Sequence, residues 1–235
     1  MQLQFSLTNS NINSVISTTD ETATLIHIWG DVGVGKTTLC YSATLSKLAQ
    51  GKKVIYISTK SFFKHERFTK LKQYYSDFDE YNFLLYTPSN FSQQTEILMN
   101  LEFLILKEIN ILKRTQIGLI VLDSASILWH LEMKKSEHNN KTMRALNTTI
   151  ATLDYIRRTY EIPILITNRS VIRIKDDKNI AQPANNTVMN FWAKIRMKIE
   201  RTQQPAIRSF NLEMHPHHPN LPFHFRSELT EKGFI

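Results

Sequence analysis

The stretch GDVGVGKTT at residues 30–38 constrains the fold of this 235-residue chain more than any other feature. It satisfies the pattern G-x-x-x-x-G-K followed by Ser or Thr. It also lies between an apolar run at 23–29 and a segment with helical spacing at 37–51, which is the strand-loop-helix context that the pattern requires. Its glycines let backbone N–H groups converge on phosphate oxygens, and the start of the following helix adds a positive dipole. The pattern therefore predicts a phosphate-binding loop for a nucleoside triphosphate.

Side chains of this loop and of a later strand are expected to complete the site. Lys36 would reach the β- and γ-phosphates of ATP, and the Thr37 hydroxyl would bind Mg²⁺. Asp123 lies near the end of the apolar run at 117–124, where ligands of open α/β sheets are found. It would hold Mg²⁺ through a water, and Ser124 could bond a neighbouring phosphate ligand. The residues of the loop predicted to bind nucleotide are Gly30, Asp31, Val32, Gly33, Val34, Gly35, Lys36, Thr37 and Thr38.

Apolar runs alternate with helical segments along most of the chain. The predicted strands are 23–29, 52–58, 82–86, 117–124 and 162–168, and the predicted helices are 37–51, 64–75, 91–114 and 140–160. This alternation predicts an α/β fold with a mostly parallel sheet flanked by helices. After residue 190 the segments are shorter and alternating, which predicts a C-terminal antiparallel extension. We expect a single domain over residues 1–235, with residues 1–22 as an N-terminal lead-in segment.

The charge balance favours a polyanionic partner. The chain has 29 Lys and Arg against 21 Asp and Glu, which gives a formal net charge of +8. Such an excess attracts nucleic acids or anionic surfaces through long-range forces and counterion release.

The sequence does not favour a membrane protein or a protein held together by disulfides. No run approaches the roughly 18 apolar residues of a membrane span, and the first residues lack the layout of a signal peptide. We therefore expect a cytoplasmic protein with no membrane partner. Cys40 is the single cysteine, so an internal disulfide is excluded and a small buried side chain is expected.

In their order and spacing, these segments resemble the RecA-type recombinase superfamily, and within it the short archaeal RadB-like paralogues. Besides the phosphate loop, the resemblance rests on KVIYIST with FFKHERF, NFLLYTPSNFSQQ, LIVLDSASILWHLE, IRRTYEIPILITN, NFWAKIRMKIER and FHFRSELTEKGF. It implies a RecA-like P-loop NTPase core that binds ATP, Mg²⁺ and single-stranded DNA and acts in DNA repair and recombination. The implied partners are a full-length recombinase, which the protein would assist or regulate, and further copies of the chain in a homo-oligomer.

Two cations depart from the pattern of that superfamily. In KSFFKHER, Lys60 stands where E-G-x-F-x-x-E-R has its first Glu, and Arg169 follows the dipeptide TN where a Gln that senses the γ-phosphate is usual. A lysine ammonium has no lone pair with which to activate water. We therefore predict weak or absent ATP hydrolysis, and hypothesise that Lys60 and Arg169 clamp the γ-phosphate. The alternative is that both point to solvent or pair with acids of a neighbouring subunit.

Another basic residue of the same stretch has two interpretations. Lys64 matches the basic residue that lies near the adenine in the superfamily, where its aliphatic stem would cover the base. A lysine on the surface of a helix would look the same.

Two segments are candidates for DNA contact. RSVIRIKDDKNIAQPANN at 169–186 corresponds in the resemblance to a loop that binds single-stranded DNA, and HLEMKKSEHNNK at 130–141 corresponds to a second DNA loop. Lys and Arg side chains in such loops neutralise phosphates without reading bases. The predicted DNA-binding residues are Arg173, Lys175 and Lys178 in the first segment and Lys134 and Lys135 in the second. The alternatives are an ordinary loop in the first case and solvated charges in the second.

The run HPHHP at 215–219 is interpreted as a hairpin turn. Its histidines are too close together for a tetrahedral metal site without distant partners, no cysteine is nearby, and the prolines favour a turn.

A second class of function stays open from the residues alone. The same fold supports KaiC-like or other P-loop regulatory ATPases that act through protein partners instead of DNA, because fold does not fix function. Lys60 stands against a KaiC-like regulator, which would keep a carboxylate pair after the second strand. Affinity for single-stranded DNA with and without ATP would separate the two classes.

Overall fold

The computed structural model describes residues 12–13, 24–60, 63–135, 139–175, 178–218 and 220–235. The lead-in segment predicted at residues 1–22 lies outside these ranges except for residues 12 and 13. Four predicted DNA-binding residues have only their backbone in the described part, and their side chains lie outside it: Lys134, Lys135, Lys175 and Lys178.

The described elements follow the predicted alternation of strands and helices. The strands are β1 Leu25–Gly30, β2 Lys53–Ser58, β3 Phe83–Tyr86, β4 Ile117–Asp123, β5 Ile164–Lys175, β6 Lys178–Pro183, β7 Ile195–Arg201, β8 Ile207–Met214, β9 Phe223–Thr230 and β10 Gly233–Phe234. The helices are α2 Lys36–Ala49, α3 His65–Lys72, α4 Phe91–Leu112, α5 Ile127–Lys135, α6 Asn139–Tyr160 and α7 Asn186–Trp192, with a 3-10 turn η1 at Glu80–Asn82.

The strands of the described part form one sheet in the order β10-β9-β8-β7-β1-β5-β4-β2-β3, and β6 pairs with β5 outside this path. In the part of this order from β7 to β3, neighbouring strands run parallel to each other. Those from β7 to β10 run antiparallel. The predicted α/β class, with a mostly parallel sheet and a C-terminal antiparallel extension, is therefore confirmed.

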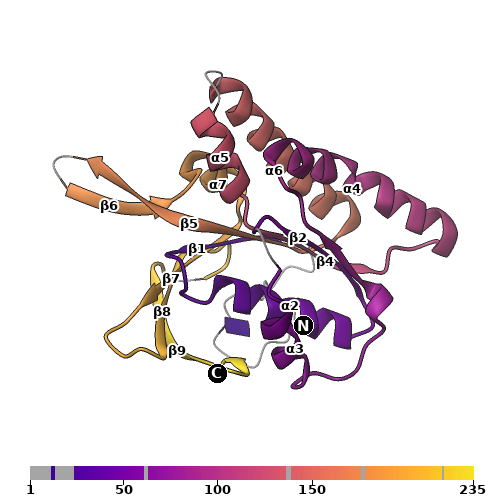
Figure 1. The fold of residues 1–235 in the computed structure, drawn as a ribbon, viewed down its shortest axis with the longest axis horizontal. Coiled ribbons are helices and arrows are strands. Elements are labelled where there is room, and N and C mark those ends of the chain that lie inside the picture. The colour runs from indigo at the N-terminus through magenta and orange to yellow at the C-terminus, as the bar shows by residue number, and fades with distance from the viewer. Residues whose placement is uncertain (1–11, 14–23, 61–62, 136–138, 176–177, 219) are drawn as a thin grey trace.

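Helices cover both faces of the central strands, with α2 and α3 on one face and α4, α5 and α6 on the other (Figure 1). Strand β2 shows how each face acquires its core. Val54 and Tyr56 pack with α2, whereas Ile55 and Ile57 pack with α4 and α6, because successive side chains of a strand point to opposite faces. Strands buried on both faces read as continuous apolar runs, which explains why they could be predicted.

The segment at 169–186, interpreted from the sequence as a loop, is largely a β-hairpin. Strand β5 continues beyond the core to Lys175, and β6 returns antiparallel to it. The hairpin projects from the body of the sheet in Figure 1. Ile172 and Ile174 are 70% and 77% exposed. These β-branched residues favour an extended backbone. Because they are exposed, the segment has no buried face that would mark it as a strand, and its polar composition suggested a loop.

The second predicted DNA loop, at 130–141, is also regular structure where it is described. Its residues form the end of α5 and the start of α6. Helix α7 was not predicted, because seven residues are too few to carry a clear helical period.

The structure also shows the surroundings of Cys40 and of the HPHHP run. Cys40 is fully buried, as predicted. The histidines of HPHHP lie in the connection between antiparallel β8 and β9, and no cluster of three potential metal-ligating side chains occurs among the described residues. None of the described helices is long and apolar enough to cross a membrane.

Candidate nucleotide-binding site

The predicted phosphate loop connects β1 to α2 at the centre of the sheet. Strand β1 lies between β5 and β7, and ends at Gly30. A Cβ on Gly30 would lie 2.1 Å from the backbone oxygen of Ile199, so only glycine permits this approach of β7. Gly35 has φ +106° and immediately precedes α2, a left-handed conformation that glycine adopts without strain. The loop thus brings the N-terminus of α2 to the end of β1.

Lys36 folds back over the loop. Its Nζ donates to the carbonyl oxygens of Gly30 at 2.7 Å and Asp31 at 2.6 Å. Burial lowers the pKa of Lys36 to about 8. Repulsion from Lys60 lowers this pKa further, whereas attraction to Asp123 opposes the shift. A phosphate ligand would replace two carbonyl oxygens as the acceptor of this ammonium.

The carboxylate of Asp123 is the centre of the buried part of the site. Asp123 ends β4 and is 1% exposed. Its Oδ1 accepts a hydrogen bond from the Thr167 hydroxyl at 2.6 Å. Its Oδ2 accepts from the hydroxyls of Thr37 at 2.8 Å and Tyr56 at 3.0 Å. Burial alone would raise the pKa of Asp123, but the Lys60 ammonium and the hydrogen bonds donated to the carboxylate hold it below its usual value.

Lys60 joins the same cluster from the residues that follow β2. Its Nζ lies 2.8 Å from Asp123 Oδ2 and also donates to Thr37 Oγ1. The ammonium therefore stands between the two side chains predicted to bind Mg²⁺. A hydroxyl and a carboxylate are suitable donors for that ion, but in this arrangement both already bind an ammonium. The residues as placed do not fit a divalent ion beside Lys60.

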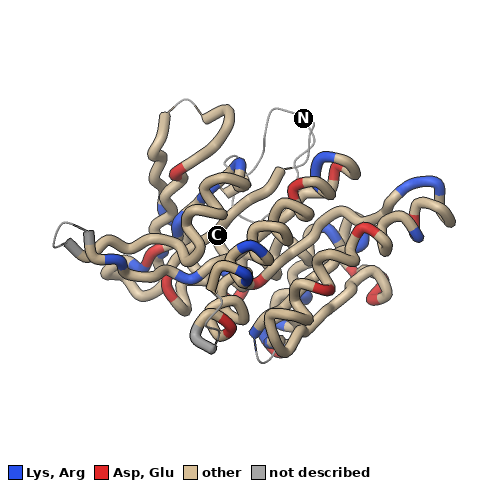
Figure 2. The backbone as a smooth tube through the Cα atoms, turned by 90° about the horizontal axis from the view of Figure 1, so that it is seen from above, with Lys and Arg blue, Asp and Glu red and all other residues tan. Residues whose placement is uncertain are grey.

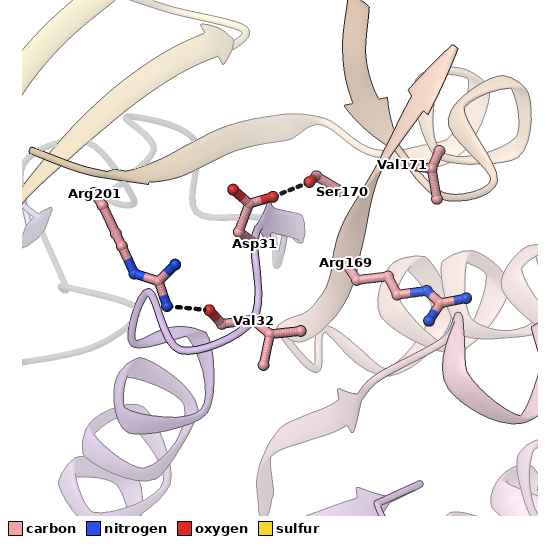
Figure 3. A pocket seen from close by; sticks show the side chains of 6 residues that line it. All are labelled: Asp31, Val32, Arg169, Ser170, Val171 and Arg201. Atoms are coloured by element: carbon pink, nitrogen blue, oxygen red, sulfur yellow. Dashed lines mark hydrogen bonds between the residues drawn. The ribbon is translucent and has the colours of Figure 1, made fainter.

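The outer side of the loop is a separate part of the site. A hollow of about 510 Å³ there is lined by Asp31, Val32, Arg169, Ser170, Val171 and Arg201 (Figure 3). Arg201 donates to the carbonyl oxygen of Val32 at 2.7 Å, and the Ser170 hydroxyl donates to Asp31. Figure 3 shows the guanidinium of Arg169 directed away from Arg201. Lys60 thus binds at the buried end of the site, whereas Arg169 lines its rim.

The remaining predicted residues lie around these two parts. Val34 is buried in the core, so only its backbone can face a ligand, and Thr38 lies in the first turn of α2. The Ser124 hydroxyl lies 3.4 Å from that of Ser126. Lys64 is exposed just before α3, where its backbone N–H donates to the Tyr41 hydroxyl at 3.3 Å.

The contacts of Tyr56, Thr167 and Arg201 with the site were not predicted from the sequence. A tyrosine or threonine inside an apolar strand has no distinguishing signal, and these two reach Asp123 because β2 and β5 flank β4. Arg201 ends β7, the parallel neighbour of β1. A basic residue at the end of a strand was visible in the sequence, but its proximity to the loop depends on this pairing.

Of the five candidate DNA residues, Arg173 has its side chain in the described part of the chain. Arg173 is exposed on β5. Lys and Arg are spread over the molecule and interspersed with Asp and Glu in Figure 2. Net charge therefore does not by itself locate a nucleic-acid face.

The sheet order and the loop between β1 and α2, faced by Asp123 at the end of β4, define an α/β protein with a RecA-like core. The chain belongs to the Rad51 family, whose model matches residues 2–233.

Within this family, the chain is similar to individual proteins named RadB. A protein of Methanococcus maripaludis named DNA repair and recombination protein RadB is 34% identical over 198 residues, which is 84% of each chain. One of the same name from Methanobrevibacter smithii is 28% identical over 211 residues, covering 88% of this chain and 86% of the relative. A solved structure of the RadB recombinase matches with a TM-score of 0.75 over 98% of both chains, at 22% identity. The predicted resemblance to RadB-like members of the RecA superfamily is confirmed.

Proposed function

We propose that this chain is a cytoplasmic DNA repair and recombination protein that binds ATP at the phosphate loop and single-stranded DNA at the β5–β6 hairpin. It would assist or regulate a full-length recombinase, docked on that partner or assembled with its own copies, and would hydrolyse ATP weakly or not at all. Membership of the Rad51 family and the names of the relatives support the role in recombination. The proposal that the chain binds ATP rests on one observation, namely that Thr37, Lys60 and Asp123 contact one another beside the loop.

The loop has the features that attract a triphosphate. Its backbone N–H groups and the start of α2 present partial positive charge. Lys36 lies on the loop itself and can exchange its two carbonyl partners for phosphate oxygens. The ligand would therefore bind through sequence-independent contacts to its phosphates, with Lys64 as the candidate neighbour of the base.

Within the described residues, the position from which a carboxylate would activate water holds an ammonium. Lys60 takes the position of the expected carboxylate, and an ammonium has no lone pair that could accept a proton. Asp123 is already the acceptor of hydrogen bonds from Thr37, Tyr56 and Thr167, in addition to its ion pair. These contacts favour a role in which ATP stays bound as a conformational ligand, instead of one in which ATP is hydrolysed in each cycle.

Strand β5 offers a physical link between nucleotide and DNA. Thr167 bonds Asp123, Ser170 bonds Asp31 of the loop, and Arg173 lies further along the same strand in the exposed hairpin. A ligand that changes the position of the loop would act directly on the base of the hairpin. Coupling of this kind requires ATP to alter DNA affinity, and DNA to alter ATP affinity by the same factor.

The test is a set of equilibrium titrations on the purified chain. We expect ATP binding, little phosphate release, and affinity for mixed-sequence single-stranded DNA that falls steeply with salt and changes when ATP is added. Brisk hydrolysis would contradict the proposed loss of catalysis. ATP binding with no DNA binding at low salt would instead favour a regulator acting through protein partners.

A further inference from the structure

Lys60 occupies a chemically decisive position. In phosphate-loop proteins the hydroxyl after the loop lysine and an aspartate at a neighbouring strand end hold a divalent cation. Here Thr37 Oγ1 and Asp123 Oδ2 lie 2.8 Å apart, and Lys60 Nζ bonds both. A charged nitrogen is therefore already bonded to the two oxygens that a metal ion would need.

The cluster gives the ammonium reasons to stay. The carboxylate of Asp123 is almost fully buried, and a buried charge is strongly destabilised unless a partner offsets it. Lys60 provides that partner from within the chain, because the β2–β4 register places Ser58 opposite Asp123. A tethered group of this kind acts at an effective concentration on the order of millimolar or higher. A divalent ion from solution would have to displace a competitor that never diffuses away.

The same ammonium is accessible to a phosphate. It carries three N–H donors, and the contacts to Thr37 and Asp123 use two of them. The side chain of Lys60 is 32% exposed, in contrast to the buried carboxylate behind it. An oxygen of a phosphate held by the loop can therefore accept the third N–H.

We propose that Lys60 replaces the divalent cation, so that the site takes a nucleoside triphosphate in its metal-free form. This inference rests on the proposed binding of ATP and revises the expectation that Mg²⁺ joins Thr37 and Asp123. In excess Mg²⁺ nearly all ATP in solution carries the metal, which would have to be shed before binding. Mg²⁺ should therefore weaken the binding of ATP to this protein, the reverse of its effect at a metal-dependent site.

The experiment compares ATP affinity in EDTA and in excess Mg²⁺ by isothermal titration calorimetry. We expect the unmodified chain to bind at least as tightly in EDTA as in Mg²⁺. In Lys60→Ala the order should reverse, with affinity in EDTA reduced about tenfold or more, equivalent to about 1.4 kcal/mol, and partly restored by Mg²⁺. Lys107→Ala, which removes an exposed lysine of α4, is the matched control and should keep the behaviour of the unmodified chain.

A second readout needs no nucleotide. Mn²⁺ titrated into the protein and followed by electron paramagnetic resonance should bind Lys60→Ala, whose Thr37 and Asp123 oxygens are released, and should not bind the unmodified chain at this site. If Lys60→Ala does not fold, Lys60→Gln keeps a long polar side chain and removes the charge, and the same two measurements apply.

The outcomes separate the two proposals. ATP binding that requires Mg²⁺ in the unmodified chain, or equal Mn²⁺ binding with and without Lys60, overturns the replacement of the metal and leaves the proposed ATP binding intact. Absence of ATP binding in both EDTA and Mg²⁺ overturns the proposed function at its first step.

Discussion

The cluster around Asp123 and the β5–β6 hairpin share one strand but differ in what holds their side chains. In the cluster, hydroxyls and an ammonium converge on a carboxylate that is 1% exposed. On the hairpin, Ile172 and Ile174 are largely exposed, and the two strands are joined by backbone pairing. A substitution in the cluster should therefore disturb folding and ligand binding together, whereas a substitution on the hairpin should change binding alone.

The largest expected effect is that of Asp123→Ala on stability. The change leaves the hydroxyls of Tyr56 and Thr167 without the acceptor they use, and the Lys60 ammonium without its carboxylate partner. Removing one partner of a buried ion pair costs about 3–5 kcal/mol, and the partial exposure of Lys60 favours the lower end. Urea denaturation measures the free energy of unfolding. Asp77→Ala, at an exposed aspartate after α3, should leave it unchanged, and equal effects of the two variants would remove the basis of the comparison.

The next effect, intermediate in size per pH unit, is expected from a change of pH and again concerns the buried side. His27 on β1 is fully buried, and burial with repulsion from Arg196 lowers its pKa to about 3. The unfolded chain takes up a proton near pH 6.5 that the folded histidine does not accept. The contribution of His27 to the free energy of unfolding should thus be constant above that pH and fall by up to about 1.4 kcal/mol per pH unit on acidification towards pH 3. The lowered pKa of Asp123 adds a loss of the same sign at the acidic end.

Denaturation curves at several pH values test this dependence. Neither ring nitrogen of His27 has a hydrogen-bond partner within the described structure, so His27→Leu should fold and should lose the part of the slope between pH 6.5 and 4. A slope that persists unchanged in this variant would assign the dependence to other groups.

The smallest effect on stability is expected on the hairpin. Arg173→Ala removes an exposed cation and should change the free energy of unfolding by less than about 0.5 kcal/mol. If the hairpin contacts DNA, affinity for single strands should fall and the salt slope should decrease by about 1. Lys107→Ala on α4 controls for the loss of one positive charge. Unaltered DNA binding in Arg173→Ala would place the contact elsewhere, and a large loss of stability would show that the hairpin side chains are not independent of the fold.

Much of the architecture could be predicted because burial on both faces leaves a visible mark. Strands β2 and β4 are nearly continuous apolar runs, and α4 and α6 show clear helical periods. The hairpin could not be predicted in this way, because its exposed isoleucines alternate with polar residues and pack against no core. The phosphate loop and Asp123 were expected to face each other, but the bond between Lys60 and Asp123 was not.

The glycine-rich loop between β1 and α2 and the order of strands and helices could be predicted from the residues alone, since glycine spacing and hydrophobic period are properties of neighbouring residues. That Lys60 faces Asp123 and Thr37 while Arg169 lies on the rim depends on how distant strands pair. The physical reason is strand register: pairing of β2 with β4 and of β4 with β5 determines which distant side chains meet. That register follows from burying both faces of the sheet at once, which no local stretch of residues specifies.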